Sequence, residues 1–253
     1  MTQIDAHYSE LRLAEVYDAG NGWSADRDFY LEIAGSSPIR VLDLGCGTGL
    51  LCDAYAIKNH HVTGVDPAAS MLEVARRKSN GQKIEWVLAT AQSFSSIKRY
   101  DHSIITDHAF HVLLEECDVR DTFRIMREHL AENGRIVFES RNPSIDWASR
   151  WNKSVKLTLQ NDEVNNERKV ITRTADRIYF ETSYHFSDST LISQSELRFW
   201  TAAKITELLR DCGLEAIDLY GDWDKTSFNP ESSEEMIFIV RVDCGRFHRV
   251  DVA

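Results

Sequence analysis

The stretch Val41–Leu51 constrains the fold more than any other part of the chain. It is an apolar run that carries Asp43 and continues into glycines at alternate positions, Gly45, Gly47 and Gly49. Such a run predicts a buried strand, and the glycines predict a tight turn that brings backbone close to a ligand before a helix begins. Because strands and helices alternate downstream, we predict a doubly wound α/β sheet that binds its ligand at the carboxyl ends of the strands.

The order of the predicted elements indicates one core sheet with an insertion. Apolar runs with strand character occur at residues 40–44, 61–65, 84–89, 101–106, 135–139, 214–220 and 236–242. After the fifth run the pattern changes, and the apolar residues alternate with period two, as in an antiparallel hairpin or small sheet. We therefore predict a core formed by residues 1–142 and 201–253, and an antiparallel β insertion over residues 143–200.

Two local boundaries follow from single residues and short segments. Gly134 follows a helical pattern that Asp118 can cap, so we expect Gly134 to end that helix. The polar segment Asn161–Arg168 lacks an apolar face, and we expect a loop or turn there.

Composition excludes several classes of function. The chain has 253 residues, 43% of them hydrophobic, and a formal net charge of -11. An acidic surface repels phosphate backbones, so nucleic acid is not an expected partner. No apolar run is long enough to cross a membrane, and the amino terminus lacks the basic and apolar segments of a signal peptide.

The cysteines indicate a reducing compartment. There are five of them, scattered without a CxxC pair: Cys46, Cys52, Cys117, Cys212 and Cys244. Neither a disulfide framework nor a zinc ribbon fits this spacing, so we expect a cytoplasmic protein.

The glycine loop discriminates among ligand classes. A dinucleotide site has GxGxxG, whereas Gly49 comes one residue early; a phosphate loop has GxxxxGK, whereas Val41–Leu51 contains no Lys or Arg. Asp43 would repel a phosphate but suits a cation. S-adenosylmethionine, which carries a sulfonium, an ammonium and an adenosine, fits best. Asp66 ends the second strand, where an acid binds ribose hydroxyls in such folds, although Asp66-Pro67 can also simply begin a helix.

Val41–Leu51, His61–Lys78 and Asp101–Glu139 together resemble the class I S-adenosylmethionine-dependent methyltransferases. Within them, the chain is most similar to the small-molecule group with a methyltransferase domain of the ubiquinone/menaquinone type. The resemblance implies a Rossmann-like sheet of seven strands in the order 3-2-1-4-5-7-6, with the last strand antiparallel. An antiparallel insertion after strand 5 also occurs in a subset of these enzymes, where it caps the substrate cleft.

The resemblance also implies which residues bind the cofactor. The implied set is Tyr17, Asp43, Gly45, Cys46, Gly47, Gly49, Asp66, Pro67, Met71, Thr90, Ala91, Gln92, Asp107 and His108. In these enzymes the glycines approach the methionine moiety, the acid before them faces its ammonium, and the acid after the second strand binds ribose. Met71 and the turn Thr90–Gln92 would border the adenine, although relatives usually have an acid where Thr90 stands. Asp107-His108 would line the methionine side, beneath a lid that contains Tyr17.

Methyl transfer is an in-line displacement, to which the protein contributes mainly positioning and, for weak nucleophiles, a base. His111, after the fourth strand, is the best candidate base; alternatively it is a hydrogen-bonded histidine at a helix start. His108 and His111 could begin a metal site, but no further clustered ligand supports one. Arg141 could hold a substrate carboxylate or carbonyl, or it could pair with Glu139 and fix the loop.

The predicted function is therefore S-adenosylmethionine-dependent methyl transfer to an oxygen, nitrogen or carbon of a small molecule. An RNA or protein methyltransferase is an alternative. The acidic charge opposes it, as does Asp107–Phe110, which replaces the Asn-Pro-Pro-Tyr type of tetrapeptide typical of amino-group methylation. A non-enzymatic S-adenosylmethionine binder is a second alternative. The sequence leaves the acceptor open, and it does not distinguish a monomer from a dimer.

Overall fold

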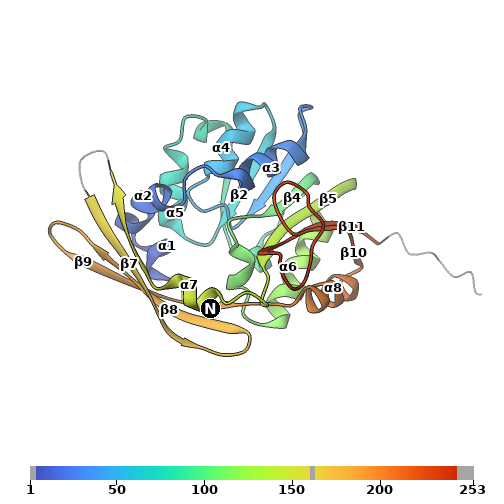
Figure 1. Cartoon of the computed structure of the whole chain (residues 1–253). Helices are drawn as coiled ribbons and strands as arrows, with labels where there is room; N and C mark the ends of the chain where they lie inside the picture. Colours follow the sequence, from blue (N-terminus) through green and yellow to red (C-terminus); the bar gives the residue numbers. More distant parts are fainter. Residues whose placement is uncertain (1–3, 160–162, 244–253) are drawn as a thin grey trace, which may run out of the picture.

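The computed structural model describes residues 4–159 and 163–243 and contains two separate β-sheets (Figure 1). The core sheet has seven strands in the order β10-β11-β5-β4-β1-β2-β3. Its strands are β1 (Arg40–Leu44), β2 (His61–Asp66), β3 (Glu85–Leu88), β4 (Tyr100–Ile105), β5 (Leu130–Arg141), β10 (Leu214–Tyr220) and β11 (Glu235–Val242). β11 pairs antiparallel with both β5 and β10, and the pairs from β5 to β3 are parallel. The predicted order with an antiparallel last strand is confirmed.

Helices cover both faces of the core sheet because its strands are apolar on both sides. The helices are α3 (Ala25–Ala34), α4 (Leu50–Ile57), α5 (Ala69–Arg76), α6 (Glu116–His129) and α8 (Ala202–Asp211). Along β1 the buried side chains alternate: Val41 packs in a cluster with Tyr30 and Tyr55, and Leu42 packs in another with Phe123 and Leu208. The strand order reverses between β1 and β4, so the carboxyl ends of these two strands form the topological switch point where such sheets bind ligands.

The second sheet lies in the predicted insertion. It follows the short helix α7 (Trp147–Trp151) and has four antiparallel strands, β6 (Lys153–Thr158), β7 (Glu163–Arg173), β8 (Arg177–His185) and β9 (Thr190–Arg198), in that order. Along β8 the side chains alternate between buried and half-buried, with Phe180 and Tyr184 among the buried ones. The period of two in the sequence thus reflects a sheet with one buried face.

Two amino-terminal helices, α1 (Ala6–Ser9) and α2 (Leu11–Gly20), connect the two sheets (Figure 1). Leu13 packs with Tyr184 of the inserted sheet, whereas Ala14 packs with Met71 of the core helix α5. Lys78 pairs with Asp18 at 2.5 Å on the core side. The amino terminus of the chain therefore contacts both halves of the molecule.

Three local predictions were wrong. Asp118 does not cap a helix, because the N-cap of α6 is Glu115 and Asp118 lies in its first turn. Gly134 does not end a helix: α6 ends at His129, and Gly134 lies within β5, where an added Cβ would come within 2.8 Å of the Tyr100 carbonyl oxygen. Of the predicted loop Asn161–Arg168, the described part, Glu163–Arg168, is the first half of β7. One face of that strand is solvated and the other carries Arg168, so the polar sequence hid a strand; Asn161 and Asp162 lie outside the described residues.

The described cysteines Cys46, Cys52, Cys117 and Cys212 are free thiols, and Cys244 lies outside the described residues. No helix between residues 4 and 243, as far as the structure describes them, is long and apolar enough to cross a membrane. In the same part of the chain, no three His, Cys, Asp or Glu side chains gather closely enough to hold a metal ion.

Candidate active site

The glycine loop after β1 adopts a backbone that few other residues could form. Gly45, Gly47 and Gly49 have φ values of 78°, 52° and 73°, in the left-handed region. A Cβ on Gly49 would lie 2.4 Å from Cη2 of Trp86, so this glycine also provides space for a core indole. A Cβ on Gly47 would meet nothing within 4 Å, so the loop backbone borders open space there.

Asp43 is a buried carboxylate that lacks a cationic partner. Its Oδ2 accepts a weak hydrogen bond from the thiol of Cys52 at 3.3 Å, and its Oδ1 has no partner among the described residues. Burial raises the pKa of Asp43 to about 7. An unsatisfied buried carboxylate favours a cationic ligand, because such a ligand offsets the cost of desolvating the charge. The ammonium of S-adenosylmethionine has the required charge.

Asp66, at the end of β2, holds the glycine loop in place. Its Oδ2 accepts a hydrogen bond from the Gly47 N–H and its Oδ1 accepts one from the Ala68 N–H, both at 2.8 Å. Burial raises the pKa of Asp66 to about 6. Each oxygen of this carboxylate keeps a further lone pair for a ligand hydroxyl. Two acids and no basic residue in the loop suit an adenosine-bearing cation and oppose a phosphate.

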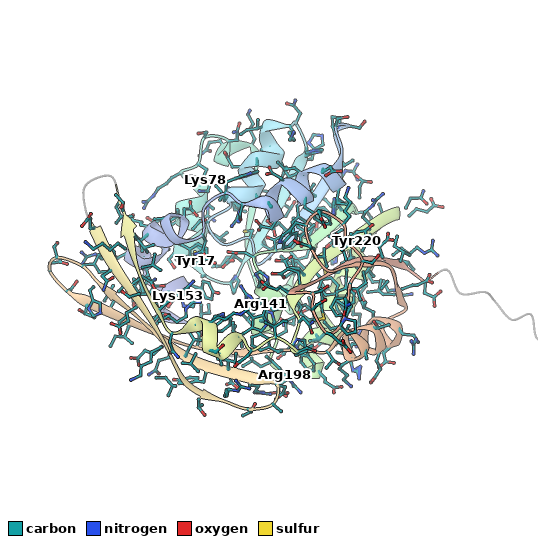
Figure 2. The ribbon with its side chains drawn as sticks, in the orientation of Figure 1. Tyr17, Lys78, Arg141, Lys153, Arg198 and Tyr220 are labelled. Atoms are coloured by element: carbon teal, nitrogen blue, oxygen red, sulfur yellow. The ribbon has the colours of Figure 1, made fainter. Side chains whose placement is uncertain are left out.

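The carboxyl end of β4 is held in an unusual backbone conformation. Asp107 and His108 have φ values of 55° and 59°, and the His108 N–H donates to Oε1 of the buried Glu139 at 2.7 Å. The Tyr17 hydroxyl of α2 donates to Asp107 at 2.9 Å. Tyr17 and Arg141 both lie in the central part of the molecule, between the core sheet and the inserted sheet (Figure 2). The lid position that the resemblance implied for Tyr17 stays a prediction.

His108 and Glu235 form a hydrogen-bonded pair that the sequence did not reveal. The Nε2 atom of His108 lies 2.8 Å from Oε2 of Glu235, which begins β11. Burial lowers the pKa of His108 well below its usual value, so the imidazole is neutral at pH 7. If Nε2 carries the proton and donates to the carboxylate, Nδ1 keeps a lone pair, and no described residue hydrogen-bonds to it. Only the fold brings residues so distant in sequence together.

His111 is fully buried, and both of its ring nitrogens are occupied by backbone groups. Nε2 accepts a hydrogen bond from the Arg141 N–H at 2.9 Å, so the ring proton is on Nδ1, which donates to the Arg198 carbonyl at 2.6 Å. Burial keeps the pKa of His111 well below 6.5. This geometry matches the alternative reading of a hydrogen-bonded histidine and leaves the ring no free nitrogen to take a proton.

Arg141, whose backbone N–H bonds to His111, has no carboxylate partner for its side chain. Its guanidinium carbon lies 5.5 Å from the ring centroids of both Trp147 and Trp151. Glu139, the alternative partner, instead accepts hydrogen bonds from the Tyr30 hydroxyl and the His108 N–H. Within the described residues no carboxylate oxygen comes within 4.0 Å of the Arg141 guanidinium.

The remaining predicted cofactor residues differ in burial. The Thr90 hydroxyl caps the short 3-10 helix Ala91–Ser93 by accepting from the Ser93 N–H at 3.2 Å, and Gln92 is half-buried in that turn. Met71 is fully buried in the first turn of α5, where it packs with Ala14 of α2, and Pro67 precedes that helix. Burial raises the pKa of the Cys46 thiol to about 11, so Cys46 remains protonated at neutral pH.

Residues 41–134 match a protein family described as a methyltransferase domain. That range begins at β1 and includes the glycine loop, the end of β2 and the end of β4. The chain is an S-adenosylmethionine-dependent methyltransferase whose core sheet has the class I strand order. S-adenosylmethionine is its cofactor, and the unpaired carboxylate of Asp43 and the open space beside Gly47 fit that ligand.

Known proteins resemble the methyltransferase over most of its length. A protein of Geobacillus sp. (strain WCH70) named "Putative methyltransferase" is 28% identical over 222 residues, which cover 79% of this chain and 83% of that protein. The structure of an S-adenosylmethionine-dependent methyltransferase from Clostridium acetobutylicum aligns with a TM-score of 0.76 at 18% identity, covering 91% of this chain and 98% of that one. The structure of S-adenosylmethionine-bound CalS10 from Micromonospora echinaspora, an amino pentose methyltransferase, aligns with a TM-score of 0.66 at 19% identity, covering 89% and 95%. These structural likenesses concern the fold.

Proposed function

We propose that the methyltransferase transfers the cofactor's methyl group to an oxygen, nitrogen or carbon of a small molecule. The observation that carries this proposal is the contact between Tyr17 of α2 and Asp107 at the end of β4, which places a helix over the site. Residues 143–200 would form the acceptor side of the site. A site bordered by a helix and an inserted sheet favours a small acceptor. CalS10, named as an amino pentose methyltransferase, has an acceptor of that size.

The loops after β1, β2 and β3 would each bind a different part of the cofactor. In this proposal, Gly45, Gly47 and Gly49 approach the methionine moiety and Asp43 faces its ammonium. Asp66 binds the ribose hydroxyls. Thr90 already caps a turn with its hydroxyl, so backbone groups of that turn and the Gln92 side chain would reach the adenine edge.

When bound, S-adenosylmethionine supplies an electrophilic methyl group, whose bond to sulfur breaks as the acceptor's lone pair forms the new bond and the old bonding pair stays on sulfur. The chain would orient the acceptor and take up its proton when the nucleophile is an alcohol, phenol or carbon acid. His108 is the better candidate for that proton, because its Nδ1 is free and Glu235 fixes Nε2. His111 would instead position Arg141, since its nitrogens are both bonded to backbone.

The two alternatives from the sequence, an RNA or protein methyltransferase and a non-enzymatic binder, gain no support from the comparisons. A direct experiment tests the proposal. The protein is incubated with S-adenosylmethionine and fractions of a metabolite extract of low molecular mass, and S-adenosylhomocysteine is quantified. We expect product to form with at least one fraction and the methylated acceptor to be identifiable by its added mass. Tight cofactor binding without product in any fraction would contradict the proposal.

A further inference from the structure

Two arginines from different sheets converge on one tryptophan. Arg141, at the end of core strand β5, has its guanidinium carbon 5.5 Å from the Trp151 ring centroid. Arg168, on β7 of the inserted sheet, has its guanidinium carbon 5.6 Å from the same ring and 4.9 Å from the Phe180 ring. Guanidinium groups favour such positions over aromatic faces, but the rings carry no net charge. The two cations therefore share an apolar wall without being neutralised by it.

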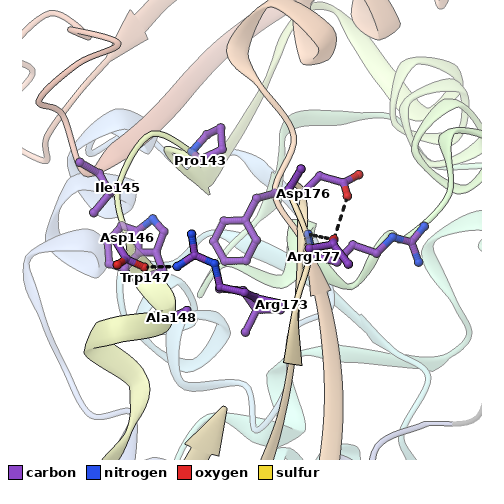
Figure 3. A pocket seen from close by; sticks show the side chains of 12 residues that line it. Pro143, Ile145, Asp146, Trp147, Ala148, Arg173, Asp176 and Arg177 are labelled. Atoms are coloured by element: carbon purple, nitrogen blue, oxygen red, sulfur yellow. Dashed lines mark hydrogen bonds and ion pairs between the residues drawn. The ribbon is translucent and has the colours of Figure 1, made fainter. Parts of the chain in front are cut away.

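The other arginines near this wall are all paired with acids. The pocket in Figure 3, lined by α7 and the turn between β7 and β8, shows one case: Arg173 bonds to Asp146 at 2.6 Å. Further pairs close to it are Arg150–Glu234 at 2.7 Å, Arg177–Glu115 at 2.7 Å and Arg198–Asp176 at 2.9 Å. That pocket is therefore already neutral, and it does not contain the two arginines that share Trp151.

Arg141 and Arg168 differ from these residues because no described carboxylate oxygen lies within 4.0 Å of either guanidinium. The Nε–H of Arg168 is also buried without a hydrogen-bond partner among the described residues. A buried donor without an acceptor is costly, and two nearby like charges repel each other. An anion placed between the two guanidinium groups would accept a hydrogen bond from the buried donor and offset the repulsion between the two positive charges.

The positive charge of Arg141 lies on the side of the site where we propose that the acceptor binds. Arg141 lies next to the strand end that carries Asp107 and His108, and His111 fixes its backbone. Trp147, Trp151 and Phe180 add a cluster of aromatic rings on the side of the inserted sheet. An acceptor bound there would meet a charged end and an apolar surface together.

We propose that Arg141 and Arg168 bind a carboxylate of the methyl acceptor, whose apolar part packs on Trp151 and Phe180. The inference rests on the proposed function, because it names the class of acceptor for that site. A planar carboxylate matches the forked donors of guanidinium groups, and the aromatic wall suits a flat or branched carbon skeleton.

The test is a set of carboxylic acids with their matched amides, added to protein saturated with S-adenosylhomocysteine. Benzoate, phenylacetate, 3-phenylpropionate and 4-hydroxybenzoate serve as probes, and binding is measured by calorimetry. Quenching of tryptophan fluorescence gives a second signal from Trp147 and Trp151. We expect at least one acid to bind about 10-fold or more tightly than its amide, because only the acid brings a negative charge to the two guanidinium groups.

Variants separate the arginines from general charge. Arg168→Met and Arg141→Met should each lower the affinity for that acid about 10-fold or more, and Arg168→Lys should lower it less. Lys169→Met is the matched control, since it removes an exposed positive charge from the neighbouring position of the same strand. It should leave the affinity unchanged. Circular dichroism checks that each variant is folded. If Arg168→Met does not fold, Arg168→Lys still tests the role of this arginine.

The outcomes distinguish this inference from the proposed function. Binding of S-adenosylhomocysteine together with equal affinity for every acid and its amide would overturn the carboxylate site alone. Acid binding that survives both arginine substitutions would do the same. Two results would instead contradict the proposed function. One is that the wild-type protein does not bind S-adenosylhomocysteine, and the other is that it forms no S-adenosylhomocysteine from S-adenosylmethionine with any extract fraction.

Discussion

The backbone N–H of Arg141 donates a 2.9 Å hydrogen bond to Nε2 of His111, and His111 in turn donates from Nδ1 to the carbonyl of Arg198. This buried imidazole therefore joins the end of a core strand to the last strand of the inserted sheet. Its contacts are those of a residue that sets the relative position of two elements. They determine where the Arg141 guanidinium lies.

His111→Ala should destabilise the protein and weaken acceptor binding without changing the pH dependence of turnover. It would leave one buried N–H and one buried carbonyl unpaired, at a cost of about 1–3 kcal/mol each. Chemical denaturation and steady-state kinetics measure both effects. His129→Ala is a matched control, because His129 is also buried and bonds to the Ser96 N–H and the Ile125 carbonyl, away from the site. If His111→Ala loses a limb of the pH profile while stability is unchanged, the base role predicted from the sequence holds instead.

His108→Ala should lower kcat by about 10²–10⁴-fold for an alcohol, phenol or carbon acceptor, since positioned proton transfer contributes about that much. Its affinity for S-adenosylhomocysteine, measured by calorimetry, should change little. An unchanged kcat would remove His108 from the chemistry.

The pH dependence of turnover should reflect Glu235. Burial raises the pKa of Glu235 to about 7, and its ionised form accepts the Nε2–H of His108 more strongly than its protonated form. We therefore expect kcat/KM to fall as the pH drops below about 7, and Glu235→Gln to remove that limb. Glu234→Gln, which alters an exposed neighbour, is the control. A limb that persists in Glu235→Gln would assign it to another group.

Asp43→Asn should stabilise the free protein at pH 8 and weaken its cofactor binding. The folded-state pKa of Asp43, about 7, exceeds its unfolded value near 3.8, so the folded protein retains this proton at pH 5–6 when the unfolded chain has lost it. The contribution of Asp43 to stability consequently falls as the pH rises from about 4 to about 7. In a chain of this size, each kcal/mol regained by the amide would raise the melting temperature by about 2–4 °C. Loss of melting temperature at pH 8, or unchanged affinity for S-adenosylhomocysteine, would refute the role of Asp43 as the partner of the ammonium.

Gly47→Ala should weaken cofactor binding more than it affects folding. The left-handed backbone costs an alanine roughly 1–2 kcal/mol, but the added Cβ meets nothing in the protein. Gly35→Ala is a control outside the site, also in open space, and at φ 75° and ψ -167° its backbone is still less favourable for an alanine. Thermal melting should therefore shift at least as much in Gly35→Ala, while only Gly47→Ala loses affinity for S-adenosylhomocysteine by calorimetry. Equal affinities in both would mean that the ligand does not approach this glycine.

The core sheet and its cofactor could be predicted because the decisive signals are local in sequence. Val41–Leu51 contains a buried strand, the turn and the first acid within a few residues, and Asp66 ends the next strand. Gly134 was misread because a glycine after a helical pattern usually ends a helix, whereas here the close approach of the Tyr100 carbonyl requires it within a strand.

The acceptor side could not be predicted because its contacts join distant segments. Glu235 reaches His108 only through the antiparallel placement of β11, and Arg168 reaches Trp151 only because a polar segment forms a strand of an exposed sheet. The left-handed backbone at Asp107 and His108 leaves no clear trace in the sequence either, since neither residue is a glycine. These long-range pairings decide which histidine has a free nitrogen.

The amino-terminal helices contact both halves of the molecule, through Asp18 and Lys78 on the core side and through His7 and Ser193 on the inserted sheet. A short segment held at both ends fixes the spacing of the two halves, because the contact with the core and the contact with the inserted sheet lie on the same stretch of chain.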